Sequence, residues 1–170
     1  MLRSVHIRGA VEADLGFLRE MLFEAFFWDA CNPRPSFEAF SADAEFLKLL
    51  DKWGRNGDRA VIAEQDGMSV GAAWFRLWTP EWHSYGYVDS GVPEVGMGVK
   101  PGHRSRGIGR ALLASLVEIA RAETFAALSL SVSPNNYAFS LYTSMGFHRV
   151  GESGSSWTLL LPLGSKDGEA

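Results

Sequence analysis

The segment from Glu94 to Glu123 restricts the fold of this 170-residue chain more than any other part of its sequence. Residues 94–99 are predicted to form a strand, and Lys100-Pro101-Gly102 turns the chain at its end. A helix is predicted from Gly107 to Glu123, because its apolar residues recur on one side. A strand followed by a loop and a long amphipathic helix is typical of sheets that are covered by helices.

The rest of the chain adds strands near both ends and helices between them. Asp66-Gly67 is a hairpin-turn signal, and Ser36 is placed to cap a helix. Because strands and helices alternate, we expect an α/β (α+β) fold with a mixed central sheet of about six to seven strands, flanked by helices on both faces. Strands are predicted at 5–9, 59–65, 69–78, 94–99, 128–132, 147–150 and 157–161, and helices at 12–28, 37–53, 107–123 and 135–144.

Length and composition predict the number of domains and the cellular location of the protein. We expect one domain over residues 1–163, followed by a polar C-terminal tail at 164–170. No run approaches the roughly 18 apolar residues that cross a bilayer, and the first residues lack the apolar core of a signal peptide. Cys31 is the only cysteine and is expected to be a reduced thiol. We therefore expect a cytoplasmic protein without a membrane partner.

The distribution of charge indicates an anion-binding site. The formal net charge is -4, which argues against nucleic acid as a partner. Residues 95–117 nevertheless contain no acidic residue, whereas Lys100, Arg104, Arg106 and Arg110 are basic. An acidic chain that keeps one stretch free of carboxylates is expected to bind an anion there.

The start of the helix predicted at Gly107 supplies the groups that such an anion needs. The first turn of a helix has backbone N–H groups without partners and carries partial positive charge. Gly107 and Gly109 let this backbone approach a phosphate, and Arg104 and Arg106 add charge-assisted hydrogen bonds. We therefore predict a diphosphate site, although neither the three-glycine dinucleotide fingerprint nor a P-loop is present.

Two motifs give the chain a family resemblance. The first is Arg104-Ser105-Arg106-Gly107-Ile108-Gly109, and the second is Asn135-Asn136-Tyr137-Ala138-Phe139-Ser140-Leu141-Tyr142, followed by Gly146-Phe147. In this order and spacing they resemble the two signatures of the GNAT family, the GCN5-related N-acetyltransferases. The resemblance covers residues 60–150 well and the first helices loosely, and it implies the GNAT fold.

The resemblance implies a coenzyme A site built from several segments. The backbone of Met97, Gly98 and Val99 would pair with the pantetheine arm like an extra strand. Gly96 and Gly98 fit close approach by a ligand, although a structural bulge is the alternative. Asn135 would contact the coenzyme or cap the last helix. The pyrophosphate would be held at Arg104, Ser105, Arg106, Gly107, Ile108, Gly109 and Arg110.

Two residues are candidates for the chemistry of acyl transfer. An alkylammonium has a pKa near ~10.4 and a thiol one near ~8.5, so the reaction benefits from a base and from an acid. Tyr142 matches the family tyrosine and is the candidate acid; packing is the alternative role. Glu94 opens the strand beside the thioester and is the candidate base; a solvated strand-end carboxylate is the alternative. No metal-ligand spacing links the histidines, so no metal is expected.

The sequence signals for the acyl acceptor are less specific than the motifs for the donor. Residues 26–29 and 78–87 are rich in aromatics, which with Asp29, Glu81 or Asp89 suit a cationic or aromatic amine. The same aromatics equally suit the core or a homodimer interface. The expected function is an acetyl-CoA-dependent N-acetyltransferase that acts on a primary amine of a small molecule, an amino acid or a protein, by direct attack in a ternary complex. The alternatives are a non-catalytic acyl-CoA sensor or interaction module, and a nucleotide-binding regulator.

Overall fold

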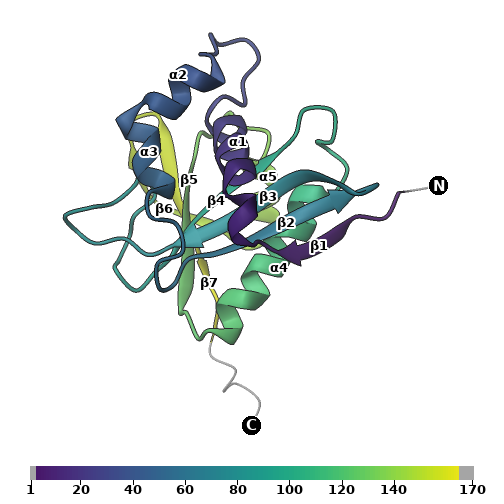
Figure 1. Cartoon of the computed structure of the whole chain (residues 1–170). Helices are drawn as coiled ribbons and strands as arrows, with labels where there is room; N and C mark the ends of the chain where they lie inside the picture. The colour runs from purple at the N-terminus through teal and green to yellow at the C-terminus, as the bar shows by residue number, and fades with distance from the viewer. Residues whose placement is uncertain (1–2, 165–170) are drawn as a thin grey trace.

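The protein is built around a seven-stranded sheet in the order β1-β2-β3-β4-β5-β7-β6 (Figure 1). The computed structural model describes residues 3–164. Neighbouring strands are antiparallel except for β4 and β5, which are parallel. The mixed sheet of about six to seven strands is thereby confirmed. The strands are β1 His6–Gly9, β2 Arg59–Gln65, β3 Met68–Arg76, β4 Glu94–Val99, β5 Ala127–Val132, β6 His148–Ser153 and β7 Ser156–Pro162.

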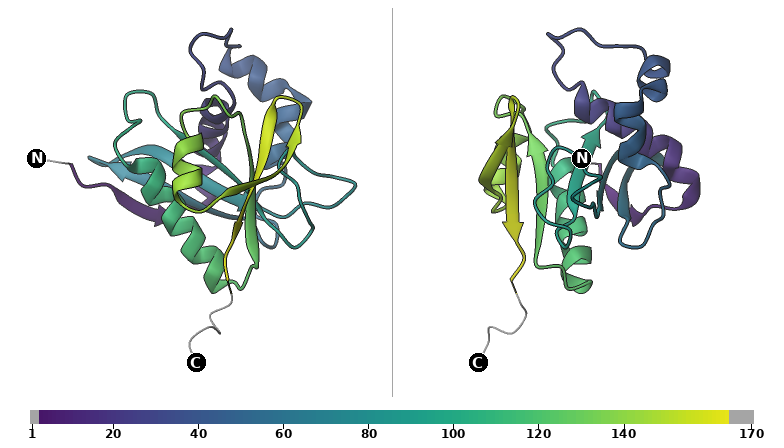
Figure 2. Two further views of the ribbon diagram at one scale, coloured as in Figure 1. Left: turned by 180° about the vertical axis from the view of Figure 1, so that it is seen from behind. Right: turned by 90° about the vertical axis from the view of Figure 1, so that its left-hand side faces the viewer.

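Helices cover both faces of the sheet, as predicted (Figure 2). Helices α1 to α3 enclose one apolar core against β2 and β3, and α4 and α5 enclose the larger core on the other face. A short 3-10 helix, η1, precedes α1. The bounds are η1 Glu12–Asp14, α1 Leu15–Phe26, α2 Phe37–Ala42, α3 Ala44–Leu50, α4 Ile108–Ala122 and α5 Phe139–Ser144.

The helix predicted at 37–53 is wrong as one element, because Asp43 divides it into α2 and α3. Asp43 has extended backbone angles, and its side chain accepts the N–H of Glu45 at 2.9 Å, which caps α3. Ser36 caps α2 as predicted, with its hydroxyl 3.1 Å from the N–H of Ala39. Apolar residues stay on the buried side across the break, so periodicity alone does not reveal it.

The last predicted helix also begins later than expected. Helix α5 begins at Phe139, with Ala138 as its N-cap, and residues 135–138 form turns instead. The side chain of Asn136 accepts the N–H of Ala138 at 2.9 Å. Asn135 therefore does not cap this helix.

The glycines of β4 make room for the protein itself. The register of β4 against β3 is continuous from Glu94 to Val99, so the bulge considered for this strand is absent. A Cβ on Gly96 would lie 2.5 Å from the indole of Trp74, and one on Gly98 would lie 2.3 Å from the carbonyl oxygen of Met21. The glycines thus let Trp74 and helix α1 lie directly on β4.

The C-terminal tail and the absence of a membrane-spanning segment are both expected from the sequence. The division into a domain at 1–163 and a tail stays a prediction, and residues 165–170 of that tail lie outside the described residues. Within residues 3–164, no helix is long and apolar enough to cross a membrane.

Candidate active site

The parallel strands β4 and β5 separate almost as soon as they pair. Their only register pair joins Glu94 to Ser129, and beyond it a cavity of about 640 Å³ lies against both strands. Residues 94–99 of β4 and 131–133 at the end of β5 line this cavity. The side of β4 that faces β5 is therefore left without a strand partner along most of its length.

One end of the cavity is the loop predicted to bind an anion, which we call the anion loop (residues 100–107). Gly107 is the N-cap of the 15-residue helix α4 and has a φ of 81°. This conformation favours glycine and directs the chain into the helix. The cavity wall includes Met97, Gly98, Val99, Arg104, Ser105, Gly107, Gly109 and Arg110. Two further predicted residues are placed elsewhere, because Ile108 is buried in the core and Arg106 is exposed away from this wall.

The side chain of Arg104 has protein partners in addition to its place on the cavity wall. Its Nε donates to the carbonyl of Val99 at 3.0 Å, and its Nη2 donates to Glu24 Oε2 at 3.0 Å. Its guanidinium carbon lies 5.2 Å from the centre of the Tyr137 ring. Arg104 therefore fastens the anion loop to α1, a role for which the sequence around it carries no signal.

Tyr142 lies on α5 in the wall of the same cavity, with 7% of its surface exposed. Its ring packs against Phe147 with 5.8 Å between the ring centres. Burial raises the pKa of the Tyr142 phenol above its usual value, so the group stays protonated at neutral pH. It can therefore donate a hydrogen bond into the cavity.

Glu94 also lines the cavity, at the point where β4 and β5 separate. Its Oε1 accepts the N–H of Gly86 at 3.2 Å, and its Oε2 has no hydrogen-bond partner among the described residues. Burial raises the pKa of Glu94 to about 7, against the opposing effects of the Ser84 hydroxyl and the Gly86 N–H, and of the charges of His83 and Lys48. A carboxylate that titrates near neutral pH is suited to accept a proton.

The irregular segment between β3 and β4, residues 77–93, holds Glu94 in this position. A Cβ on Gly86 would lie 2.7 Å from backbone atoms of Leu130 and Ser131, so only glycine lets the segment lie against β5. Ser84, in the same segment, is also buried, and its hydroxyl acts on Glu94. Sequence reasoning missed both residues, although a glycine within an aromatic-rich segment is a usable signal.

Several residues considered for the acceptor side do not line the cavity. Asp29 accepts the N–H of Cys31 at 2.9 Å, and Asp89 accepts the N–H of Gly91 at 2.8 Å. Glu81 is exposed and also lies off the cavity wall. In the second motif the cavity wall includes Asn136 and not the predicted Asn135.

The chain belongs to the acetyltransferase (GNAT) family, whose model matches residues 18–147. It is therefore an acyltransferase, and the motif resemblance is confirmed. A comparison with curated proteins found no significant match.

Solved structures of acetyltransferases share the fold. The PaiA N-acetyltransferase of Thermoplasma acidophilum in complex with coenzyme A has a TM-score of 0.71 at 20% identity, over 94% of this chain and 99% of that one. The phosphinothricin acetyltransferase of Sinorhizobium meliloti in complex with acetyl-CoA has a TM-score of 0.68 at 21% identity, over 99% and 93%. The ribosomal-protein-alanine N-acetyltransferase of Brucella melitensis has a TM-score of 0.66 at 24% identity, over 92% and 99%.

Proposed function

We propose that this protein transfers the acetyl group of acetyl-CoA to a primary amine, by direct attack of the amine in a ternary complex. The observation that carries the proposal is the position of Glu94. Its carboxylate, with a pKa near 7, lies where β4 and β5 separate, on the same cavity as the anion loop and Tyr142. Proteins of this fold have been crystallised with coenzyme A and with acetyl-CoA, which supports the choice of donor.

The residues present fit acetyl-CoA along the length of the cavity. Backbone N–H groups of residues 104–109, at the start of α4, would hold the pyrophosphate, with Arg110 beside them. Backbone groups of residues 97–99 face the gap between β4 and β5, where they can pair with the amides of an extended arm, as an added strand would. When bound, acetyl-CoA supplies a thioester carbonyl that an amine can attack.

Glu94 would act as the general base of this reaction, and Tyr142 would act as its general acid. Glu94 takes a proton from the incoming ammonium, so that the nitrogen can bond to the acetyl carbon while the carbon–sulfur bond breaks. The Tyr142 phenol donates a hydrogen bond to the departing sulfur. In the net reaction a carbon–nitrogen bond replaces the carbon–sulfur bond, one proton ends on the thiol and one is released to solvent.

Two measurements test the proposal in sequence. Titration calorimetry with acetyl-CoA, NAD and ATP should show binding of acetyl-CoA alone, and no binding of acetyl-CoA would overturn the proposal. Thiol release from acetyl-CoA with a panel of amines should then show turnover. Binding without turnover on any amine would favour the non-catalytic acyl-CoA sensor instead. The cytoplasmic location, a homodimer and the absence of a metal requirement stay predictions.

A further inference from the structure

The end of the cavity around Glu94 differs in chemistry from the end at the anion loop. Strand β4 lies between the two ends, and the five residue steps from Glu94 to Val99 span about 16 Å at roughly 3.3 Å per step. The wall around Glu94 is mainly aromatic and aliphatic, with the buried Ser84 as a polar member, and is drawn from α1, α3, β3 and the segment that follows β3. It includes Leu22, Phe26, Leu49, Trp74, Trp78 and Tyr85.

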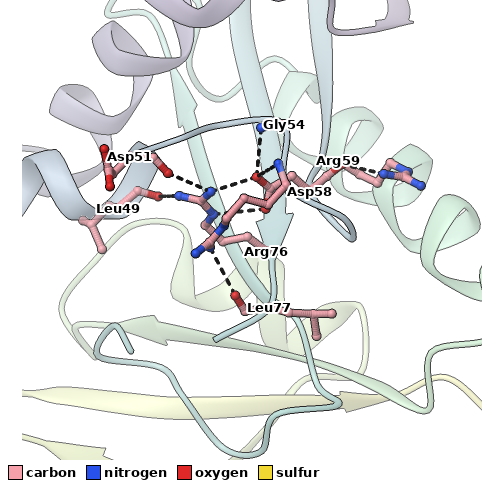
Figure 3. A network of polar contacts seen from close by, with 8 residues as sticks. Leu49, Asp51, Gly54, Asp58, Arg59, Arg76 and Leu77 are labelled. Carbon is pink, nitrogen blue, oxygen red and sulfur yellow. Dashed lines mark hydrogen bonds and ion pairs between the residues drawn. The ribbon is translucent and has the colours of Figure 1, made fainter. Parts of the chain in front are cut away.

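Two charged residues line this end, and one of them is already neutralised. Arg76 is 1% exposed, and its Nε and Nη2 donate to the Asp58 carboxylate at 3.1 and 2.8 Å. Its Nη1 donates to the carbonyl of Leu49 at 3.0 Å, and Nη2 also donates to the carbonyl of Asp51 at 3.1 Å (Figure 3). Every nitrogen of the guanidinium therefore has a protein partner, and Arg76 offers no cation to a ligand.

Among residues 3–164, Glu94 is consequently the one charged residue that lines this end and remains available to a ligand. The next cation on this side, Lys48, lies off the wall of this cavity, 3.7 Å from Glu45 and 6.0 Å from the centre of the Tyr85 ring. The nearby carboxylates Glu81 and Asp89 also lie off this wall.

This pattern selects among amines. A primary ammonium can pair with Glu94 and pass over aromatic faces, which attract cations. An aromatic or bulky apolar body gains free energy from the apolar wall. A carboxylate or a second ammonium on the same molecule would be desolvated without an opposite charge, which is costly.

We infer that the acceptor is an arylalkyl amine that has one ammonium group and carries neither a carboxylate nor a second cation. This inference rests on the proposed function, whose acceptor it names more closely. It separates such amines from α-amino acids and polyamines. It also separates them from peptide N-termini, whose polar backbone would be desolvated against this wall.

Tyr85 offers a way to test the wall without opening the core. It is 43% exposed, and its ring lies 6.2 Å from that of Phe26 on α1, so the two rings flank the cavity from different elements. Trp82 provides a matched control, since this aromatic residue belongs to the same segment, is 51% exposed and does not line the cavity.

The first experiment measures kcat/KM for thiol release from acetyl-CoA with five amines: 2-phenylethylamine, phenylalaninamide, phenylalanine, spermidine and a peptide with an N-terminal alanine. Phenylethylamine should exceed phenylalanine by about 100-fold or more, because the extra carboxylate finds no partner. The kcat/KM for phenylalaninamide should lie between the values for these two amines, since phenylalaninamide carries a neutral amide in place of the carboxylate.

The second experiment measures KM with phenylethylamine and with ethylamine. Tyr85→Ala should raise KM for phenylethylamine about 10-fold and KM for ethylamine far less, because the smaller amine does not reach the wall. Trp82→Ala should leave both values unchanged. Equal effects of the two substitutions, or none from Tyr85→Ala, would overturn the inference.

The outcomes separate this inference from the proposed function. A higher kcat/KM for phenylalanine, spermidine or the peptide than for phenylethylamine would overturn the acceptor class and leave the transferase intact. No thiol release with any amine would overturn the transferase itself, and the acceptor class with it.

Discussion

Glu24 on α1 accepts a hydrogen bond from the guanidinium of Arg104, with 3.0 Å between Oε2 and Nη2. Glu24 also pairs with Arg34, in the loop that follows α1. Trp28 of that loop packs against Tyr137, whose ring lies beside Arg104. The anion loop and the loop after α1 are thereby joined through one carboxylate and one pair of rings.

The first prediction concerns this connection. Arg104→Ala should lower the free energy of unfolding by about 1–3 kcal/mol, because Glu24, with a side chain only 12% exposed, then keeps a single cation. Arg106→Ala is the matched control, since Arg106 is exposed and forms no ion pair or side-chain hydrogen bond within residues 3–164. Urea unfolding of both variants measures the difference, and equal losses would contradict the role given to Arg104.

The second prediction concerns Tyr142. Tyr142→Phe keeps the buried ring and removes the hydroxyl, so kcat should fall about 100-fold if the phenol serves the leaving sulfur. The dissociation constant for acetyl-CoA should change little, because the anion loop is untouched. Steady-state kinetics and calorimetry on the same preparation measure both quantities. A variant with unchanged kcat would remove Tyr142 from the mechanism.

The third prediction concerns the contact between β4 and α1. Gly98→Ala should lower the free energy of unfolding by about 1–3 kcal/mol, because its Cβ would meet the carbonyl oxygen of Met21 at 2.3 Å and α1 must move. Gly9→Ala, on strand β1, has no atom within 4 Å of the added carbon and should change stability by less than about 0.5 kcal/mol. Chemical denaturation distinguishes them, and an unaffected Gly98→Ala variant would show that the contact is not tight.

The fourth prediction follows from the pKa of Glu94. The folded-state pKa is about 7 and the ordinary value is 4.5, so between these pH values the folded state keeps a proton that the unfolded state releases. Stability from this group is therefore present at low pH and is lost as the pH rises through that window. Glu94→Gln should be more stable than the wild type at pH 8, by up to about 3 kcal/mol, and similar to it at pH 4. An identical difference at both pH values would contradict the raised pKa.

Local patterns predicted much of the donor half of the molecule. The bounds of β4 and the position of Gly107 at the start of α4, as its N-cap, follow from strand alternation, a turn signal and helix periodicity, all within about 30 adjacent residues. Asp66 and Gly67 both adopt positive φ between β2 and β3, as the hairpin signal predicts.

Contacts between distant segments could not be predicted in this way. Glu24 and Arg104 are 80 residues apart, and Arg76 reaches the carbonyl of Leu49 across 27 residues. The glycines of β4 suggested a ligand, whereas the tertiary structure places Trp74 and α1 against them. The arrangement of the acceptor side depends on such contacts. The sequence therefore indicated aromatic residues there but did not predict which of them line the cavity.

The pH dependence of thiol release tests the central claim most directly. With an amine that supports turnover, kcat/KM of the wild type should fall below an inflection near pH 7, where Glu94 gains its proton. Glu94→Gln should lose this inflection and about 100-fold of the rate at pH 8, whereas Glu81→Gln, at an exposed carboxylate of the preceding segment, should match the wild type. The same inflection and rate in Glu94→Gln would contradict acyl transfer with Glu94 as its base.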